Sequence, residues 1–155
     1  VIKRMKDEGH RIEFHSPDHR RMFYPGSKSA EKYLEKGLDQ LRASGVEAKY
    51  FRPPWGMLNP FYLAAVRRKG LKLCFWSAMA QDWRRDSKVP EMRYKLLRRT
   101  IDGGLVCLHD SGEGTGGSAG APSRMIPALR QYIESRKACG YEFLSFEQAI
   151  EKGLV

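Results

Sequence analysis

The sequence predicts an α/β protein, with either a parallel sheet or a (β/α) barrel. Short apolar runs alternate along the chain with segments of helical periodicity, and glycines or prolines separate many of them. Polar and aromatic clusters directly follow several of the apolar runs. The chain has 155 residues, 41% of them hydrophobic and 30% charged, and we expect residues 1–155 to form a single domain.

Amphipathic spacing and terminal glycines or prolines predict the helices. Residues 1–8 have the character of a helix end, closed by Gly9. Further helices are expected over 27–44, 59–70, 90–101 and 125–140, with a last helical turn over 146–153.

Short apolar runs between these helices predict the strands, which we expect over 10–15, 49–54, 71–76, 104–110 and 141–145. The glycine-rich segment 111–123 lacks the Gly-Lys-Ser/Thr ending of a phosphate-binding loop. We therefore expect it to be a flexible active-site or surface loop.

The net charge of +10, from 28 basic and 18 acidic residues, favours polyanionic partners such as nucleic acid, anionic lipid or an acidic cell-wall polymer. The positive residues are spread in small groups, among them Arg84 with Arg85 and Arg98 with Arg99, and we interpret most of them as solvated helix faces. The sequence has no RNA-binding sheet signature and no Cys/His finger spacing, so no nucleic-acid partner is expected. It also has no apolar run of the ~20 residues needed for a membrane helix and no signal peptide.

Four clusters follow predicted strands: His15 with His19, residues 52–56, Asp82 with Trp83, and His109 with Asp110. In parallel α/β folds the functional residues gather at the carboxyl ends of the strands. The clusters are therefore predicted to meet at one mouth of the fold.

His15 and His19 have the spacing of two imidazoles that can bind one metal ion. Pro17 lies between them, so a turn must bring them together in place of a regular helix. The alternative is a pair of ordinary solvent or core histidines. Two histidines do not complete a catalytic metal site, which usually has three protein ligands and water.

His109 and Arg52 each allow a catalytic and a structural interpretation. His109 follows the apolar run LVCL and could transfer protons near neutral pH, or simply donate to a backbone carbonyl. Arg52 precedes two prolines and could orient a carboxylate through a bidentate contact, or be a surface arginine before a turn.

Four segments together resemble the polysaccharide deacetylases of carbohydrate esterase family four, also called the nodulation-type deacetylase domain. GHRIEFHSPDH resembles the family's metal motif, FRPPWG its Arg-x-Pro-x-Gly motif, WSAMAQDW its Asp-Trp motif and LVCLHD its Leu-His-Asp motif. The segments occur in the family's order over about a hundred residues. The resemblance implies a distorted, incomplete (β/α) barrel.

The resemblance implies a metal-dependent hydrolase that removes N-acetyl groups from a polysaccharide. His15 and His19 would bind a divalent metal, with zinc as the first candidate and cobalt or nickel as alternatives. Arg52 would orient the aspartate that acts as catalytic base. The backbone N–H of Trp55 would stabilise the oxyanion.

The remaining implied roles concern the leaving group and the acetyl pocket. His109 would be the general acid, with Asp82 holding its imidazole. Trp83 and Leu108 would line the pocket for the acetyl methyl.

The family's Thr-Phe-Asp-Asp-Gly motif, which supplies the base and the third metal ligand, is not present in this sequence. We therefore expect the chain to be the C-terminal portion of a deacetylase domain without its first strand–helix segment, with the third protein ligand outside it. By itself the chain could then be inactive.

Three functions remain open: an N-deacetylase, a catalytically inactive relative that binds glycan through aromatic residues, and a basic polyanion-binding protein. The first is favoured, with peptidoglycan or a chitin-like polymer as substrate. The family implies an extracytoplasmic or cell-wall location, and the sequence does not predict the oligomeric state.

Overall fold

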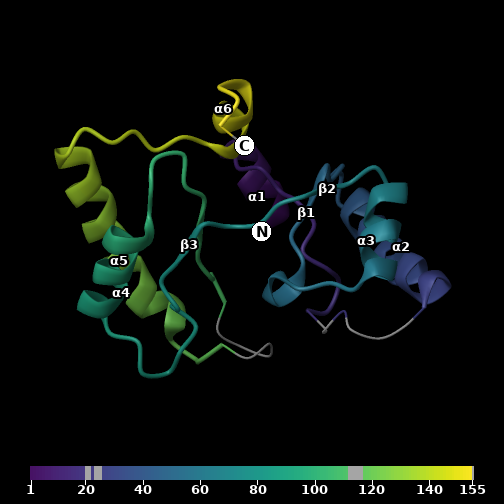
Figure 1. Ribbon diagram of the computed structural model, residues 1–155, viewed down its shortest axis with the longest axis horizontal. Coiled ribbons are helices and arrows are strands. Elements are labelled where there is room, and N and C mark those ends of the chain that lie inside the picture. Colours follow the sequence, from purple (N-terminus) through teal and green to yellow (C-terminus); the bar gives the residue numbers. More distant parts are fainter. Residues whose placement is uncertain (20–21, 23–25, 112–116, 155) are drawn as a thin grey trace. The chain divides into compact units, whose positions relative to one another are not determined.

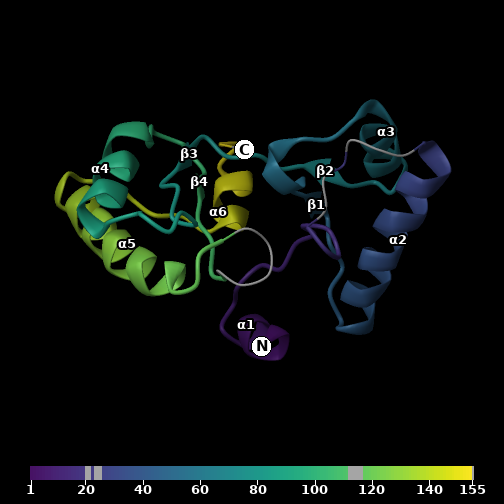
Figure 2. The same cartoon turned by 90° about the horizontal axis from the view of Figure 1, so that it is seen from below.

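The structure, a computed structural model, describes residues 1–19, 22, 26–111 and 117–154. By their contacts, the residues form two compact units, Val1–Phe75 and Trp76–Val155. Each unit contains one two-stranded parallel sheet with helices (Figures 1 and 2). Among the described residues, no helix is both long and apolar enough to cross a membrane.

In the first unit, β1 (Tyr50–Phe51) pairs in parallel with β2 (Lys72–Leu73). The helix α3 (Pro60–Arg68) makes the crossover that a parallel connection needs. The helices α1 (Ile2–Asp7) and α2 (Ser27–Ala43) precede the sheet, and the 3-10 turn η1 (Pro54–Gly56) follows β1.

The core of this unit lies between α2, α3 and the sheet, and α2 and α3 run side by side in Figure 1. Leu34, Phe51 and Val66 are fully buried there. Burial of such side chains contributes about 1.5–3 kcal/mol each, so this apolar contact dominates the stability of the unit.

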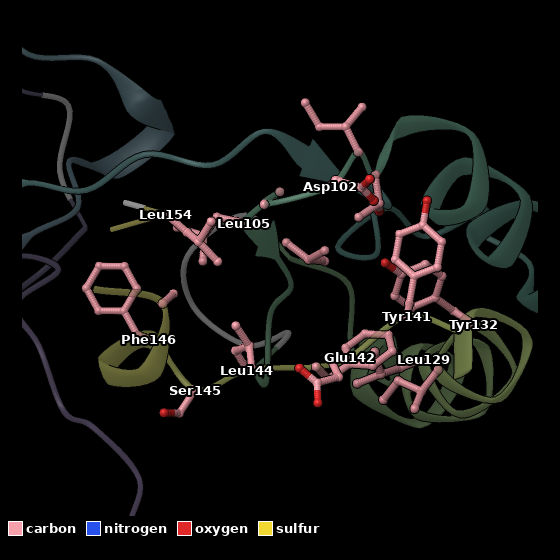
Figure 3. A pocket seen from close by; sticks show the side chains of 18 of the residues that line it. Asp102, Leu105, Leu129, Tyr132, Tyr141, Glu142, Leu144, Ser145, Phe146 and Leu154 are labelled. Atoms are coloured by element: carbon pink, nitrogen blue, oxygen red, sulfur yellow. The ribbon is translucent and has the colours of Figure 1, made fainter. Parts of the chain in front are cut away.

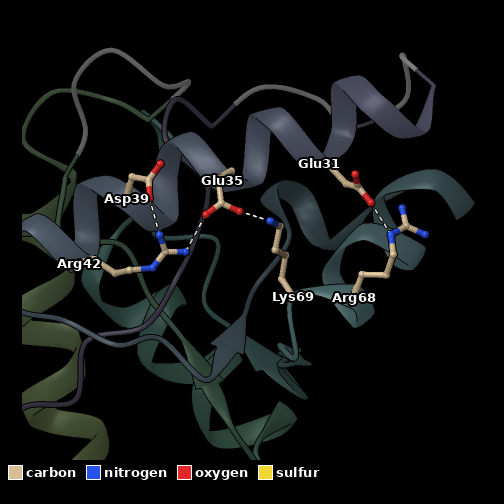
Figure 4. A network of polar contacts seen from close by, with 6 residues as sticks. All are labelled: Glu31, Glu35, Asp39, Arg42, Arg68 and Lys69. Carbon is tan, nitrogen blue, oxygen red and sulfur yellow. Dashed lines mark hydrogen bonds and ion pairs between the residues drawn. The ribbon is translucent and has the colours of Figure 1, made fainter.

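Ion pairs join α2 to the end of α3 along the edge of this core (Figure 4). Glu35 accepts hydrogen bonds from Arg42 of its own helix, at 2.8 Å, and from Lys69, the residue after α3. Glu31 pairs with Arg68 in the same way. These side chains are partly exposed, so they add less to stability than the buried contacts.

In the second unit, β3 (Ala78–Met79) pairs in parallel with β4 (Val106–Cys107), with Ala78 opposite Val106. The helices are α4 (Val89–Arg99), α5 (Ala121–Ala138) and α6 (Phe146–Glu151). The helices α4 and α5 pack against each other through buried residues that include Met92, Leu96, Ala128 and Tyr132.

The five predicted helices and the last helical turn are confirmed, with shifts of a few residues at their ends. The largest shift is at α5, which begins at Ala121 and not at 125. Pro122 explains the earlier start, because proline fits the first turn of a helix, where its missing N–H has no partner to lose.

Two predicted strands are wrong. The predicted strand 10–15 is reduced to one bridge, between Phe14 and Phe51, and 141–145 contains no strand. In the second case the backbone N–H of Tyr141 bonds the carbonyl of Arg136 at the end of α5, and Ser145 caps α6. The first residue of this segment therefore hydrogen-bonds to the end of α5, and the last residue caps the start of α6.

The prediction also missed β3, since it placed a single strand at 71–76. The chain leaves the first sheet after β2 and enters the second sheet at Ala78. β3 therefore lies just beyond the predicted strand and belongs to the other sheet.

Candidate active site

The first group of predicted site residues surrounds the turn at His15–His19, in the first unit. Phe14 fixes the start of this turn, because its N–H donates to the Tyr50 carbonyl at 3.1 Å and its carbonyl accepts from the Arg52 N–H at 2.9 Å. This bridge places His15 directly beside Arg52.

The Phe14 ring can occupy its place only because α2 has a glycine opposite it. A Cβ added to Gly37 would lie 2.5 Å from Cε2 and 2.7 Å from Cζ of Phe14. Phe14 is 3% exposed and its ring lies 5.2 Å from that of Phe51, centroid to centroid. The bridge that positions His15 is therefore anchored in the hydrophobic core.

The turn itself is built from unusual backbone, as the proline between the histidines predicted. Ser16 and His19 have left-handed φ angles of 79° and 51°, and the Ser16 hydroxyl accepts a hydrogen bond from the His19 N–H at 3.1 Å. The Tyr33 hydroxyl of α2 donates to the Asp18 carboxylate. Because left-handed backbone is costly for residues other than glycine, these contacts are needed to hold the turn.

The two imidazoles lie close together, with ring centroids 5.0 Å apart. His15 Nδ1 lies 2.6 Å from the Arg52 carbonyl oxygen. A carbonyl only accepts, so Nδ1 carries the proton and Nε2 is the unprotonated nitrogen of the neutral ring. This is the arrangement in which a second protein group orients a metal-binding histidine.

Trp55 completes this group. It lies in η1 with a left-handed φ of 54°, its side chain is exposed, and its ring centroid is 4.4 Å from that of His19. The turn is held by hydrogen bonds from the N–H of Gly56 to the Pro53 carbonyl and from Met57 to Pro54. The structure thus brings His15, His19, Arg52 and Trp55 together, and the Arg52 guanidinium also contacts the Cys74 sulfur at 3.9 Å.

The second group lies in the second unit and is centred on Asp82. Its Oδ2 accepts a hydrogen bond from the backbone N–H of His109 at 2.6 Å, and its Oδ1 accepts from His109 Nδ1 at 3.1 Å. Asp82 is fully buried, whereas the His109 side chain is 33% exposed. A buried carboxylate needs such partners, since an unpaired one would be strongly destabilising.

The parallel register explains why these two residues meet. Met79 and Cys107 are opposite each other in the last pair of the β3–β4 ladder. Asp82 follows β3 by three residues and His109 follows β4 by two, so both leave the same edge of the sheet.

Trp83 and Leu108, the two residues expected to line the acetyl pocket, have different immediate surroundings. The Trp83 ring lies 5.2 Å from that of His109, centroid to centroid, and borders an open pocket near α5. Leu108 packs against the core between α4 and α5 and lines a second cavity of about 710 Å³, shown in Figure 3. That cavity is bordered by Leu105, Tyr132 and Tyr141 among others.

Sequence reasoning missed the surroundings of Trp83. Most of the basic groups were interpreted as helix faces, and no site role was predicted for Arg84 and Arg85. They lie in the loop after β3, and Arg124 of α5 lines the same pocket. The sequence signal that could have indicated this pocket is that the two arginines directly follow Asp82 and Trp83. Much of the glycine-rich segment, at 112–116, lies outside the described residues.

No cluster of three or more His, Cys, Asp or Glu side chains suited to a metal is found where the structure describes the chain. The His15–His19 pair still fits two ligands of one ion. Two imidazoles bound to one tetrahedral ion place their ring centroids about 5 Å apart, which is the separation observed here.

Comparisons with known proteins point to the polysaccharide deacetylases. Residues 1–74 match the family model for polysaccharide deacetylase, a range that contains the whole first group of site residues. The peptidoglycan-N-acetylglucosamine deacetylase PgdA of Listeria monocytogenes is 27% identical over 153 residues, which are 96% of this chain. The chain spans 29% of that relative's length.

Two solved structures show the same fold. The Xyl-CE4 domain of a multidomain xylanase from the hindgut metagenome of Trinervitermes trinervoides has a TM-score of 0.82 at 24% identity, over 99% of this chain and 70% of that one. A family 4 acetyl xylan esterase from Clostridium thermocellum, in complex with a cobalt ion, has a TM-score of 0.79 at 24% identity, over 97% of this chain and 68% of that one. The chain is therefore similar to the polysaccharide deacetylases in sequence over residues 1–74 and in fold over nearly its whole length.

Proposed function

We propose that the protein containing this chain is a metal-dependent N-deacetylase of an N-acetylated polysaccharide. The observation that carries the proposal is the oriented pair of imidazoles, His15 with its Nδ1 fixed on the Arg52 carbonyl and His19 5.0 Å away between ring centroids. The match of residues 1–74 to the polysaccharide deacetylase family model and the cobalt-bound structural neighbour support the same proposal.

His15 and His19 would hold the divalent metal, and zinc, cobalt and nickel all suit imidazole ligands. When bound, such a metal polarises an acyl carbonyl and acidifies a bound water. The pair supplies two ligands, so a complete site needs at least one more protein ligand.

His109 is proposed as the general acid that protonates the departing amine. Its Nδ1–H donates to Asp82, so Nε2 is the ring nitrogen that can give up and regain a proton. The buried Asp82 carboxylate stabilises the imidazolium and fixes the direction of the ring through two hydrogen bonds.

Arg52 and Trp55 are proposed to serve the acyl centre. The Arg52 guanidinium would orient the carboxylate base, while its carbonyl orients His15. The Trp55 N–H would donate to the oxyanion, in a turn whose left-handed Trp55 backbone sets the direction of the peptide groups. Trp83 and Leu108 would contact the acetyl group.

The substrate is proposed to be peptidoglycan or a chitin-like polymer, acted on outside the cytoplasm or at the cell wall. The similarity to a peptidoglycan deacetylase favours the first. The chain's charge of +10 agrees with an acidic wall polymer.

The test is acetate release from N-acetylglucosamine oligomers and from peptidoglycan by the full protein, with zinc or cobalt added, for the native sequence and for His109→Asn. We expect native release and a loss of about 100- to 10,000-fold in the variant. Release unchanged in His109→Asn would overturn the assigned role. Glycan binding without any release would favour the inactive glycan-binding relative.

A further inference from the structure

We propose that the arginine pocket beside Trp83 binds a carboxylate carried by the glycan. The arginine pocket is formed by the loop after β3 and the segment that leads into α5, with Trp83, Arg84, Arg85, Ser118 and Arg124 in its lining. The inference rests on the proposed function in taking a glycan as the ligand, and it specifies which glycans the site prefers.

The pocket is a built feature of the second unit. The N–H of Ser118 donates to the Trp83 carbonyl at 2.9 Å. Arg124 Nη2 donates to the Arg84 carbonyl and to the Ser118 hydroxyl, each at 3.2 Å. These bonds join the two segments around an open cavity of about 910 Å³, which is wide enough for part of a sugar chain.

The charge of the pocket favours an anion. Arg84 donates to both carboxylate oxygens of Asp86, at 2.9 and 2.8 Å, and this pair holds the pKa of Asp86 at about 2. Asp86 therefore neutralises Arg84 at neutral pH. Within the described part of the chain neither Arg85 nor Arg124 forms an ion pair with a carboxylate, so two positive charges remain uncompensated.

The two arginines have different parts in this scheme. Arg85 is exposed, so its guanidinium is the group that would contact the ligand, in the forked geometry that suits a carboxylate. Arg124 is half-buried and bonded to both segments, so it is a positioning residue that holds the pocket in shape.

The pocket is directly connected to the proposed acid. Trp83 lines the pocket, and its ring lies against the His109 ring with centroids 5.2 Å apart. A carboxylate held by Arg85 would therefore belong to the sugar being deacetylated or to its near neighbour. Carboxylate-bearing glycans would be preferred over neutral chitin oligomers.

The test measures binding of three glycans to the full protein by calorimetry at low salt. The first is an oligomer of N-acetylglucosamine and N-acetylmuramic acid with its lactyl carboxylate free, and the second is the same oligomer with that carboxyl converted to an amide. The third carries a stem peptide on the lactyl group, so that only peptide carboxylates are free. The variants are Arg85→Gln and, as a matched control, Arg93→Gln, an exposed arginine of α4 that donates to Ser135.

We expect the native protein and Arg93→Gln to bind the free carboxylate form about tenfold more tightly than the amide, as one charge-assisted contact allows. In Arg85→Gln the preference should disappear. Equal binding of the first two glycans by the native protein, or a preference that survives in Arg85→Gln, overturns the inference. Strong binding of the third glycan, lost in Arg85→Gln, would assign the anion to the peptide and still support a carboxylate site.

Acetate release, measured separately, distinguishes this inference from the proposed function. If the carboxylate preference is present but no glycan is deacetylated, only the deacetylase proposal fails. If acetate is released equally from neutral and carboxylate-bearing glycans and binding shows no preference, only the carboxylate site fails.

Discussion

The Asp82 carboxylate holds His109 at two points, its backbone N–H and its ring nitrogen Nδ1. The first bond fixes the position of the strand end, and the second fixes the tautomer and the direction of the imidazole. Asp82 is fully buried while the His109 side chain is one-third exposed, so the pair keeps its carboxylate in the protein interior and leaves part of the imidazole accessible.

The two hydrogen bonds between Asp82 and His109 predict the effect of Asp82→Asn. Asparagine is similar in size and can still accept the backbone N–H, so we expect the fold to survive. It cannot stabilise an imidazolium by charge, and we expect the rate of acetate release to fall by about 100-fold or more. Steady-state kinetics with N-acetylglucosamine oligomers measures this loss.

Asp110→Asn is the matched control, since Asp110 is exposed and directly follows His109. It should retain nearly native activity. An Asp82→Asn protein with native kinetics, or an Asp110→Asn protein with the same defect, would contradict the assignment.

Gly37 lies within α2, where alanine would ordinarily stabilise the helix by about 1 kcal/mol. The contact with Phe14 predicts the reverse for Gly37→Ala, because its Cβ would lie 2.5 Å from the Phe14 ring. We expect the free energy of unfolding to fall by about 1–3 kcal/mol, as for other overpacked cores. Urea denaturation measures it, with Lys36→Ala as the exposed helical control.

A second background separates the steric effect from other causes. In a Phe14→Ala protein the ring is gone, so adding Gly37→Ala should cost little further stability. If Gly37→Ala lowers stability equally in both backgrounds, contact with Phe14 is not the reason for a glycine at this position.

The sequence was sufficient to predict the helices, because their apolar periodicity and terminal prolines or glycines are local signals. Strands were harder to predict, since pairing depends on partners distant in sequence. Residues 10–15 and 141–145 both have strand-like composition, yet only Phe14 finds a bridge partner. β3 was missed because Ala78 and Met79 are too short an apolar run to stand out.

The sequence predicted two of the residue pairings that the structure contains, while the roles of these residues stay predictions. The motifs predicted that His15 lies near His19 and that Asp82 holds His109, and both contacts are present in the structure. The role of Gly37 required knowledge of a residue 23 positions away.

Metal removal is expected to abolish deacetylation by the full protein. Chelation followed by addition of zinc or cobalt should restore it, because imidazole nitrogens bind both ions. His15→Ala or His19→Ala should weaken zinc binding by at least about tenfold, the effect of losing one well-oriented ligand contact. Calorimetric zinc titration measures this.

His10→Ala is the control for the metal titration, since His10 is an exposed histidine near Glu8, with 3.6 Å between His10 Nε2 and the Glu8 carboxylate. Its zinc affinity should equal that of the native protein. Equal loss in His10→Ala would show that zinc binds histidines in general and not the oriented pair.

The lowered pKa of Glu35 predicts that the free energy of unfolding falls in acid. Hydrogen bonds from Lys69 and Arg42 lower its pKa below the ordinary value of 4.5, despite some opposing desolvation. A carboxyl group with a lowered pKa in the folded state contributes stability above its unfolded pKa, and that contribution is lost as the pH falls through the folded value. We therefore expect native stability to fall below about pH 4.5 more steeply than that of Glu35→Gln, measured by urea denaturation at pH 3 to 7. Glu134→Gln, at an exposed position of α5, is the control, and its stability should depend on pH as that of the native protein does. If the stabilities of the native protein and Glu35→Gln depend on pH in the same way, the bonds to Lys69 and Arg42 do not stabilise the α2–α3 contact.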